Sequence, residues 1–346
     1  MNQSTQPAQA AQAGRSVQLA PTELPDTNAA AIAAEFIRAR REAGSPAMGM
    51  VMTLVVVTDD QHAEEAMGIA HEAAQEHPAR ILGVVIGARR GHGRVHAQIG
   101  IGVGHGGESA LIRLTGEVTA HPESVVLPLL LPDSPVVAWW PVKAPADPAG
   151  DPIGRLAQRR ITDAASIAAA GGKKLVARCA AYAPGNTDLA WTRLTPWRAL
   201  LAAAFDNPPG RPTGAVVAAE RGNPSADLLA AWLRDRLKVT VTQEVTDGPG
   251  VTTVTVGTSG GDVRITRPDG RLARYSIPGG PERPIALKRR GVPELLNEEL
   301  RRLDEDEVYA ATARALVRAA DGQATTGAKT KTGAKTGAAK TKKGKK

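Results

Sequence analysis

Residues 51–58, Val-Met-Thr-Leu-Val-Val-Val-Thr, are the stretch of sequence that decides the fold. A short, continuous run of apolar and β-branched residues is typical of a strand buried on both faces of a sheet. A helix follows, which Asp59 or Asp60 can cap, and then a second buried strand over Ile81–Ile86. This β-α-β order predicts two parallel strands joined by a right-handed crossover.

The segments around this unit extend it into an α/β domain over residues 25–141. Upstream, a helix over Asn28–Ala43 keeps Ile32 and Phe36 on one face. Downstream, we expect strands over 95–103, 111–118 and 136–140 and a short helix over 123–131. A glycine-rich turn between the first two of these strands indicates a hairpin. The sheet is therefore predicted to have mixed strand direction.

The second half of the chain, residues 152–320, is predicted to be an α+β domain with an antiparallel sheet. Residues 142–151 contain prolines and indicate a linker before it. Helical patterns occupy 153–169, 173–181, 195–206 and 225–238. Alternating strands follow, with a turn signal at 268–270, and a last helix is expected over 293–319.

Both ends of the chain are predicted to be disordered, over residues 1–24 and in a Lys-rich tail over 321–346. After Asp321 there are 8 lysines and no acidic residue, and the rest of the chain holds 35 basic and 35 acidic residues. The net charge of +8 therefore belongs to the tail. This distribution argues against a basic nucleic-acid-binding fold, although the tail could make weak, non-specific contact with nucleic acid.

The cysteine count and the apolar runs restrict the class of protein further. Cys179 is the single cysteine, which excludes an internal disulfide and a cysteine-based zinc cluster. The N-terminal stretch has no apolar segment of a secretory signal. The longest apolar run, Met48–Val57, is shorter than the roughly 20 residues of a membrane helix. We therefore expect a cytoplasmic protein with no membrane partner.

One segment, Gly102–Gly107, matches the dinucleotide-binding pattern G-x-G-x-x-G. That function needs a strand before the motif and a helix after it, so that the helix N-terminus meets the pyrophosphate. Residues 111–118 instead predict a strand. The tip of a hairpin is the favoured interpretation.

Catalytic and metal-binding patterns are weak throughout the chain. All 7 histidines lie between His62 and His121, and His92 and His96 sit on a loop-to-strand segment rather than on one helix face. Cys179 lies in a helical pattern and is predicted to be a packed residue. We assign no catalytic residue, no cofactor and no metal ligand, and we expect the protein not to be an enzyme.

Tryptophans and arginines cluster in the middle of the chain. Trp139 and Trp140 are neighbours on a predicted strand, so they point to opposite faces, and one of them is expected to be less buried. Large aromatics together with arginines are typical of interface centres. The candidate partner interface comprises Trp139, Trp140, Arg155, Arg159, Arg160, Trp191, Arg193, Trp197 and Arg198. The alternatives are core packing of the tryptophans and ion pairing of the arginines with nearby aspartates.

Three segments carry a resemblance to a known family: LLLPDSPVVAWWP (129–141), DPIGRLAQRRITD (151–163) and TDLAWTRLTPWRALLAAAFD (187–206). They resemble the OpcA family, the glucose-6-phosphate dehydrogenase assembly proteins of actinobacteria and cyanobacteria. The resemblance extends from about Leu24 to Ala320 and implies a non-catalytic partner that promotes oligomerisation and allosteric activation of that dehydrogenase. It supplies no catalytic residues. With Cys179 alone, thiol–disulfide switching within one chain is not expected.

Two alternative functions stay open at this point. The first is a nucleotide-binding α/β enzyme, which binding of NADP, NAD or ATP would distinguish. The second is a nucleic-acid-associated protein that acts through the Lys-rich tail, which steeply salt-dependent affinity would indicate.

Overall fold

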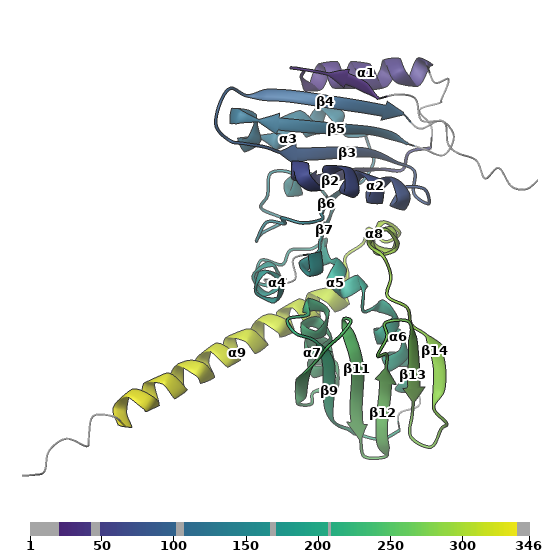
Figure 1. Cartoon of the computed structure of the whole chain (residues 1–346), viewed down its shortest axis with the longest axis vertical. Helices are drawn as coiled ribbons and strands as arrows, with labels where there is room; N and C mark the ends of the chain where they lie inside the picture. The colour runs from purple at the N-terminus through teal and green to yellow at the C-terminus, as the bar shows by residue number, and fades with distance from the viewer. Residues whose placement is uncertain (1–20, 43–48, 102–106, 167–170, 207–208, 338–346) are drawn as a thin grey trace, which may run out of the picture.

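Two β-sheets organise the chain and lie at opposite ends of the molecule, with helices between them (Figure 1). The computed structural model describes residues 21–42, 49–101, 107–166, 171–206 and 209–337. Each sheet has its own helical cover and its own buried apolar core.

The first sheet joins eight strands of the described chain in the order β1-β4-β5-β3-β2-β6-β7-β8. Their bounds are β1 (Thr22–Leu24), β2 (Met52–Thr58), β3 (Ala79–Ile86), β4 (Arg94–Ile101), β5 (Glu108–Thr115), β6 (Val136–Trp140), β7 (Arg159–Thr162) and β8 (Asn186–Asp188). All neighbouring pairs from β5 to β8 are parallel, whereas β4 is antiparallel to β1 and β5. The predicted mixed sheet is confirmed, with a parallel β2–β3 pair.

Helices cover both faces of this sheet. On one face lie α1 (Ala29–Glu42) and α3 (Pro122–Val126), and on the other lie α2 (Ala63–Ala73) and α8 (Val292–Leu300). Trp140 packs in the core of the first face and Trp139 in that of the second. Their exposed fractions are 2% and 0%, so the expectation that one of them is less buried is wrong. The cover over Trp139 includes α8, which comes from the far end of the chain.

The first sheet continues beyond the segment that we expected to be a linker. Residues 142–151 do not separate the two sheets, because β7 pairs in parallel with β6 and β8 pairs in parallel with β7. The predicted helix over 153–169 is also wrong, since β7 lies within it. Strand β7 carries two arginines among its four residues, so it lacks the apolar signal of a buried strand.

The second sheet joins six strands of the described residues in the order β10-β9-β11-β12-β13-β14. Their bounds are β9 (Pro212–Glu220), β10 (Val241–Thr246), β11 (Val251–Thr258), β12 (Gly261–Thr266), β13 (Leu272–Ser276) and β14 (Arg283–Ala286). The expected antiparallel pairing is confirmed from β9 through β14. Strand β10 is the exception, because it runs parallel to β9 after a crossover through α7 (Pro224–Leu237).

The remaining helices lie against the second sheet or between the two sheets (Figure 1). They are α4 (Gly171–Ala180), α5 (Leu189–Thr192), α6 (Thr195–Ala204) and α9 (Glu307–Gly337). Short 3-10 turns complete the elements: η1 (Asp60–His62), η2 (Gly116–Ala120), η3 (Leu127–Leu129), η4 (Gly154–Leu156) and η5 (Ala164–Ser166).

The predicted last helix and the predicted disordered ends differ in part from the structure. Two helices, α8 and α9, replace the single helix expected over 293–319. Helix α9 also continues into the Lys-rich tail, while 338–346 lie outside the described residues. At the other end, 1–20 are not described, but Thr22–Leu24 form the edge strand β1 rather than part of a disordered stretch.

Candidate functional site

The parallel strands of the first sheet follow the order found in dinucleotide-binding domains. When the strands β2, β3, β5, β6, β7 and β8 are numbered 1 to 6 along the chain, their order across the sheet is 3-2-1-4-5-6. In such a sheet a ligand binds at the carboxyl ends of the strands where the order reverses, which here are β2 and β6. The turn that would hold the pyrophosphate begins at Asp59 and contains no glycine.

Asp59 lies in this turn, and its carboxylate is paired with a lysine. Its Oδ2 lies 2.7 Å from the Lys143 Nζ, which follows β6, and its Oδ1 accepts the backbone N–H of His62 at 3.2 Å. Hydrogen bonds from Lys143 and the His62 side chain lower the pKa of Asp59 to about 2. The Asp59–Lys143 pair occupies the turn that a pyrophosphate would need, and the turn has no glycine for close approach of the backbone, so the residues present do not fit a dinucleotide.

The glycine motif at Gly102–Gly107 joins two strands. Strands β4 and β5 pair antiparallel up to Ile101 and Glu108, which confirms the predicted hairpin, although residues 102–106 lie outside the described residues. A strand after the motif leaves no helix N-terminus to receive a phosphate.

The groups considered for nucleophilic or metal chemistry occupy poor environments for it. Cys179 is 3% exposed, and burial raises the pKa of its thiol to about 12, so the thiolate needed for nucleophilic attack is strongly disfavoured. Among the described residues no three His, Cys, Asp or Glu side chains gather at a spacing that could hold a metal ion. In the same part of the chain no helix is long and apolar enough to span a membrane.

The nine sequence-predicted interface residues do not form one surface. Trp139, Trp140, Trp191 and Trp197 are core residues with 0–2% exposure. Arg155 is exposed on η4, whereas Arg159 and Arg160 are buried on β7.

Arg160 has a structural role, because its guanidinium binds groups of this chain. Its guanidinium donates to the Asn186 side chain at 2.6 Å and to the carbonyl of Ala157 at 2.5 Å, and it also contacts the carbonyl of Pro184. These contacts hold the loops around β7 and β8 together. The site role expected for Arg160 has no support in this arrangement.

Arg193 forms an ion pair with an aspartate, which is the alternative that the sequence left open. Its two terminal nitrogens donate to the two carboxylate oxygens of Asp163 at 2.8 and 2.9 Å. Asp163 is 4% exposed, so Arg193 neutralises a buried carboxylate and is held in place by it.

Arg198 has a different environment, at a groove of about 760 Å³ between α6, α7 and the start of α9. Its Cζ lies 3.7 Å from the centre of the Trp191 ring, and its Nη2 donates to the hydroxyl of Thr195 at 3.2 Å. The Nε has no hydrogen-bond partner, and the described residues give Arg198 no ion pair. Burial lowers the pKa of Arg198, while Asp306 and Glu298 oppose that shift.

The same groove contains Trp232, which we did not select from the sequence. Trp232 is half-buried on α7, and it is the only one of the five tryptophans, all of them described, that is not fully buried. Arg236 lies one turn further along α7 and also lines the groove. A tryptophan and an arginine four residues apart on a predicted helix are a signal that the sequence offers for an interface. The interface residues predicted from the sequence lie between 139 and 198 and do not include this pair.

The groove has a rigid wall. The Trp191 Nε1 donates a hydrogen bond to the Asp306 carboxylate at 2.8 Å, and the centres of the Trp191 and Tyr309 rings lie 5.8 Å apart. Arg159 pairs with Glu299 and donates to the carbonyl of Asp304 at 2.8 Å. We call this site the Trp232 groove, and its exposed or half-buried charged and aromatic residues are Arg198, Trp232, Arg236, Glu298, Arg302, Asp304, Glu305, Asp306 and Glu307.

The chain matches two models of one protein family, which describe two domains of a glucose-6-phosphate dehydrogenase subunit. Residues 70–179 match the model of its N-terminal domain, and residues 184–313 match the model of its C-terminal domain. None of the curated proteins matches the chain. Among solved structures, an oxidoreductase from Sinorhizobium meliloti is similar at 11% identity and a TM-score of 0.37, over 76% of this chain and 86% of that one. A likeness at this level carries no argument about fold or function.

Proposed function

Because this chain belongs to the OpcA family of glucose-6-phosphate dehydrogenase assembly proteins, we propose that it is a cytoplasmic, non-catalytic partner that binds this dehydrogenase and activates it. The observation that carries the proposal is the pair of family matches, which together span most of both sheets. A partner that binds the active oligomer more tightly than other forms shifts the population towards it. Coupling of this kind is typically about 1–3 kcal/mol.

The non-catalytic part of the proposal is supported by the environments of the candidate chemical groups. Asp59 and Lys143 occupy the position where a dinucleotide-binding domain receives a phosphate. The thiol of Cys179 is buried and its pKa is raised to about 12. Both arrangements are suited to holding a fold together rather than to turnover.

We place the dehydrogenase on the Trp232 groove. Interface centres are enriched in tryptophan and arginine, and here Trp232, Arg198 and Arg236 line one depression. Arg198 is half-buried, lines the groove and forms no ion pair with the described residues, so we expect its guanidinium to pair with a carboxylate of the bound protein.

The wall of the groove favours tight binding for a second reason. Trp191 is fixed by Asp306 and Tyr309, and Arg198 is stacked on Trp191. Groups that are already ordered lose little conformational entropy when a partner binds. Glu305 and Glu307 add negative charge beside the arginines, so the groove suits a partner surface of mixed charge.

The test compares groove variants with a matched arginine outside the groove. We expect Arg198→Ala or Trp232→Ala to weaken activation of the dehydrogenase more than tenfold, equivalent to about 1.4 kcal/mol of binding. Arg155→Ala removes an exposed arginine of η4 and should change activation less than twofold. Circular dichroism and melting temperature verify folding.

Two outcomes contradict the assignment of the groove. One is normal activation by folded Arg198→Ala and Trp232→Ala proteins. The other is a loss with Arg155→Ala as large as with Arg198→Ala, which would move the interface to η4.

A further inference from the structure

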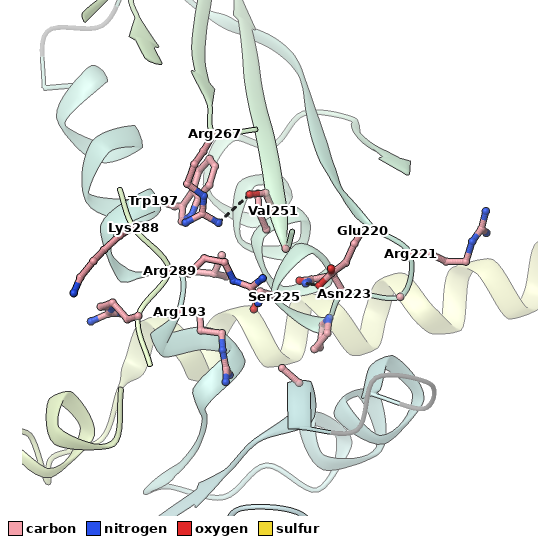
Figure 2. Close-up of a pocket in the computed structure, with 16 residues that line it drawn as sticks. Arg193, Trp197, Glu220, Arg221, Asn223, Ser225, Val251, Arg267, Lys288 and Arg289 are labelled. Atoms are coloured by element: carbon pink, nitrogen blue, oxygen red, sulfur yellow. Dashed lines mark hydrogen bonds between the residues drawn. The ribbon is translucent and has the colours of Figure 1, made fainter. Parts of the chain in front are cut away.

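A basic cavity of about 330 Å³ lies in the second half of the chain, beside the β9-α7-β10 unit (Figure 2). It opens at the carboxyl end of β9, where the chain turns through Glu220–Pro224 into α7. In a β-α-β unit this is the place where the positive end of the helix dipole and the free N–H groups of its first turn meet an anion.

The cavity has more positive charge than the described residues neutralise. The lysines and arginines that line it are Arg193, Arg221, Arg267, Lys288, Arg289 and Arg290. Three of them have carboxylate partners: Arg193 pairs with Asp163, Lys288 with Glu294 and Arg290 with Glu298. Arg221, Arg267 and Arg289 have none among the described residues. One carboxylate, that of Glu220, lines the described part of the cavity, and it accepts a hydrogen bond from Asn223 at 2.9 Å.

Arg267 is the strongest indication that the cavity receives an anion. Its side chain is 5% exposed and stacks over Trp197, with 4.9 Å between Cζ and the ring centre. It donates to the carbonyls of Leu287 and Val251 at 3.0 Å, but its buried Nε has no partner in the described structure. Burial, and then repulsion by Arg289, lower the pKa of Arg267 to about 10. A buried cation without a counter-charge is costly, and a bound anion removes that cost.

Arg289 approaches the same point from the segment after β14. A Cβ placed on Gly250 would lie 3.8 Å from the Arg267 Nη2 and 3.9 Å from the Arg289 Cζ, so both guanidinium groups border one small volume. Figure 2 shows the Arg289 side chain reaching across the cavity towards Ser225. Ser225 is the second residue of α7, where the backbone N–H has no acceptor within the helix.

We propose that this cavity binds the phosphate group of a small phosphate ester. Two guanidinium groups and a helix N-terminus are the donors that proteins use for phosphate, and guanidinium forks match the geometry of its oxygens. The volume is at the lower end of the range for small-molecule sites, which limits the ligand to a small organic phosphate. The assignment is independent of the proposed partner, because every residue in it comes from this chain.

The experiment measures binding to the full chain alone by calorimetric titration at constant ionic strength. The probes are inorganic phosphate and glycerol 3-phosphate, with glycerol as the neutral control. We expect saturable binding of one phosphate per chain and no binding of glycerol. Tighter binding of glycerol 3-phosphate than of inorganic phosphate identifies the ester as the ligand class, and the reverse order overturns that part of the proposal.

Charge variants distinguish the site from general attraction of anions. Arg289→Gln should weaken phosphate binding at least tenfold. It is expected to fold because the Arg289 side chain is exposed and the hydrogen bond from Arg289 to the Gly270 carbonyl comes from the backbone N–H, which the substitution keeps. Arg221→Gln removes the same charge from a side chain that points away from the cavity in Figure 2, and it should weaken binding less than threefold. Absence of saturable binding by the wild type, or equal weakening in the two variants, would overturn the proposal.

Discussion

Glu299→Ala should destabilise the protein strongly, because Glu299 holds α8 on the first sheet. Glu299 is 7% exposed; it pairs with Arg159 of β7 and accepts a hydrogen bond from Thr192 at 2.6 Å. After the substitution Arg159, which is 3% exposed, keeps a single acceptor, the carbonyl of Asp304 at 2.8 Å. Removing one partner of a buried pair costs about 3–5 kcal/mol, a large part of the roughly 5–15 kcal/mol that stabilises a typical domain.

Urea unfolding followed by circular dichroism measures this loss, and a double variant provides its control. Arg159→Met with Glu299→Leu removes both charges and replaces them with apolar side chains of similar volume. It should recover most of the lost free energy of unfolding, because neither group is then left buried and unpaired. A loss below about 1 kcal/mol for Glu299→Ala would refute the role assigned to the pair. Since Glu299 also lines the Trp232 groove, the single variant should activate the dehydrogenase poorly as well.

Trp139→Ala and Trp140→Ala should each lower the free energy of unfolding by about 3–5 kcal/mol, since both rings are buried, and chemical denaturation that shows a loss under about 1 kcal/mol would contradict this packing. The pKa of Asp59 is about 2 against an ordinary 3.8, so its pairing stabilises the fold above about pH 4 and is lost as the pH falls towards 2; Lys143→Ala should raise that pKa, as NMR titration of the carboxyl can measure. Removal of residues 323–346 should leave the melting temperature unchanged, because the segment has no apolar side chain beyond alanine, and a drop of several degrees would show that the tail packs on the body.

The sequence was informative where one local pattern determines the structure. The run at 52–58 forms β2, and the segment 79–86 forms its parallel neighbour β3. The turn at Pro268-Asp269-Gly270 lies between β12 and β13, as its residues predict. In these places the period of apolar residues and the turn chemistry agree with the tertiary fold.

The prediction was wrong where contacts distant in sequence decide burial. Strand β7 contains Arg159 and Arg160, whose charges are satisfied by Glu299, 140 residues away, and by carbonyls of neighbouring loops. A pattern based on hydrophobicity takes such a segment for a surface helix. The position of Trp139 depends likewise on α8, and no local signal indicates that α8 returns to the first sheet.

The candidate site was predicted only in part for the same reason. Arg198 and Trp191 were selected from their composition, and the structure stacks them at the Trp232 groove. Trp232 was missed because α7 is apolar around most of its circumference: the sequence places Trp232 and Arg236 one turn apart, but it does not show that this side of the helix faces solvent. The basic cavity combines residues from 165 to 290, which only the folded chain brings together.

Binding and activation of glucose-6-phosphate dehydrogenase can be measured together on one mixture. Light scattering coupled to size exclusion is applied to this protein and the glucose-6-phosphate dehydrogenase of the same organism in equimolar amounts, and kcat/KM is determined on the eluted fractions. We expect one species of higher mass than either protein alone, with a higher kcat/KM than that of the free dehydrogenase. Two separate peaks at micromolar concentration, with an unchanged kcat/KM, would contradict the proposed function.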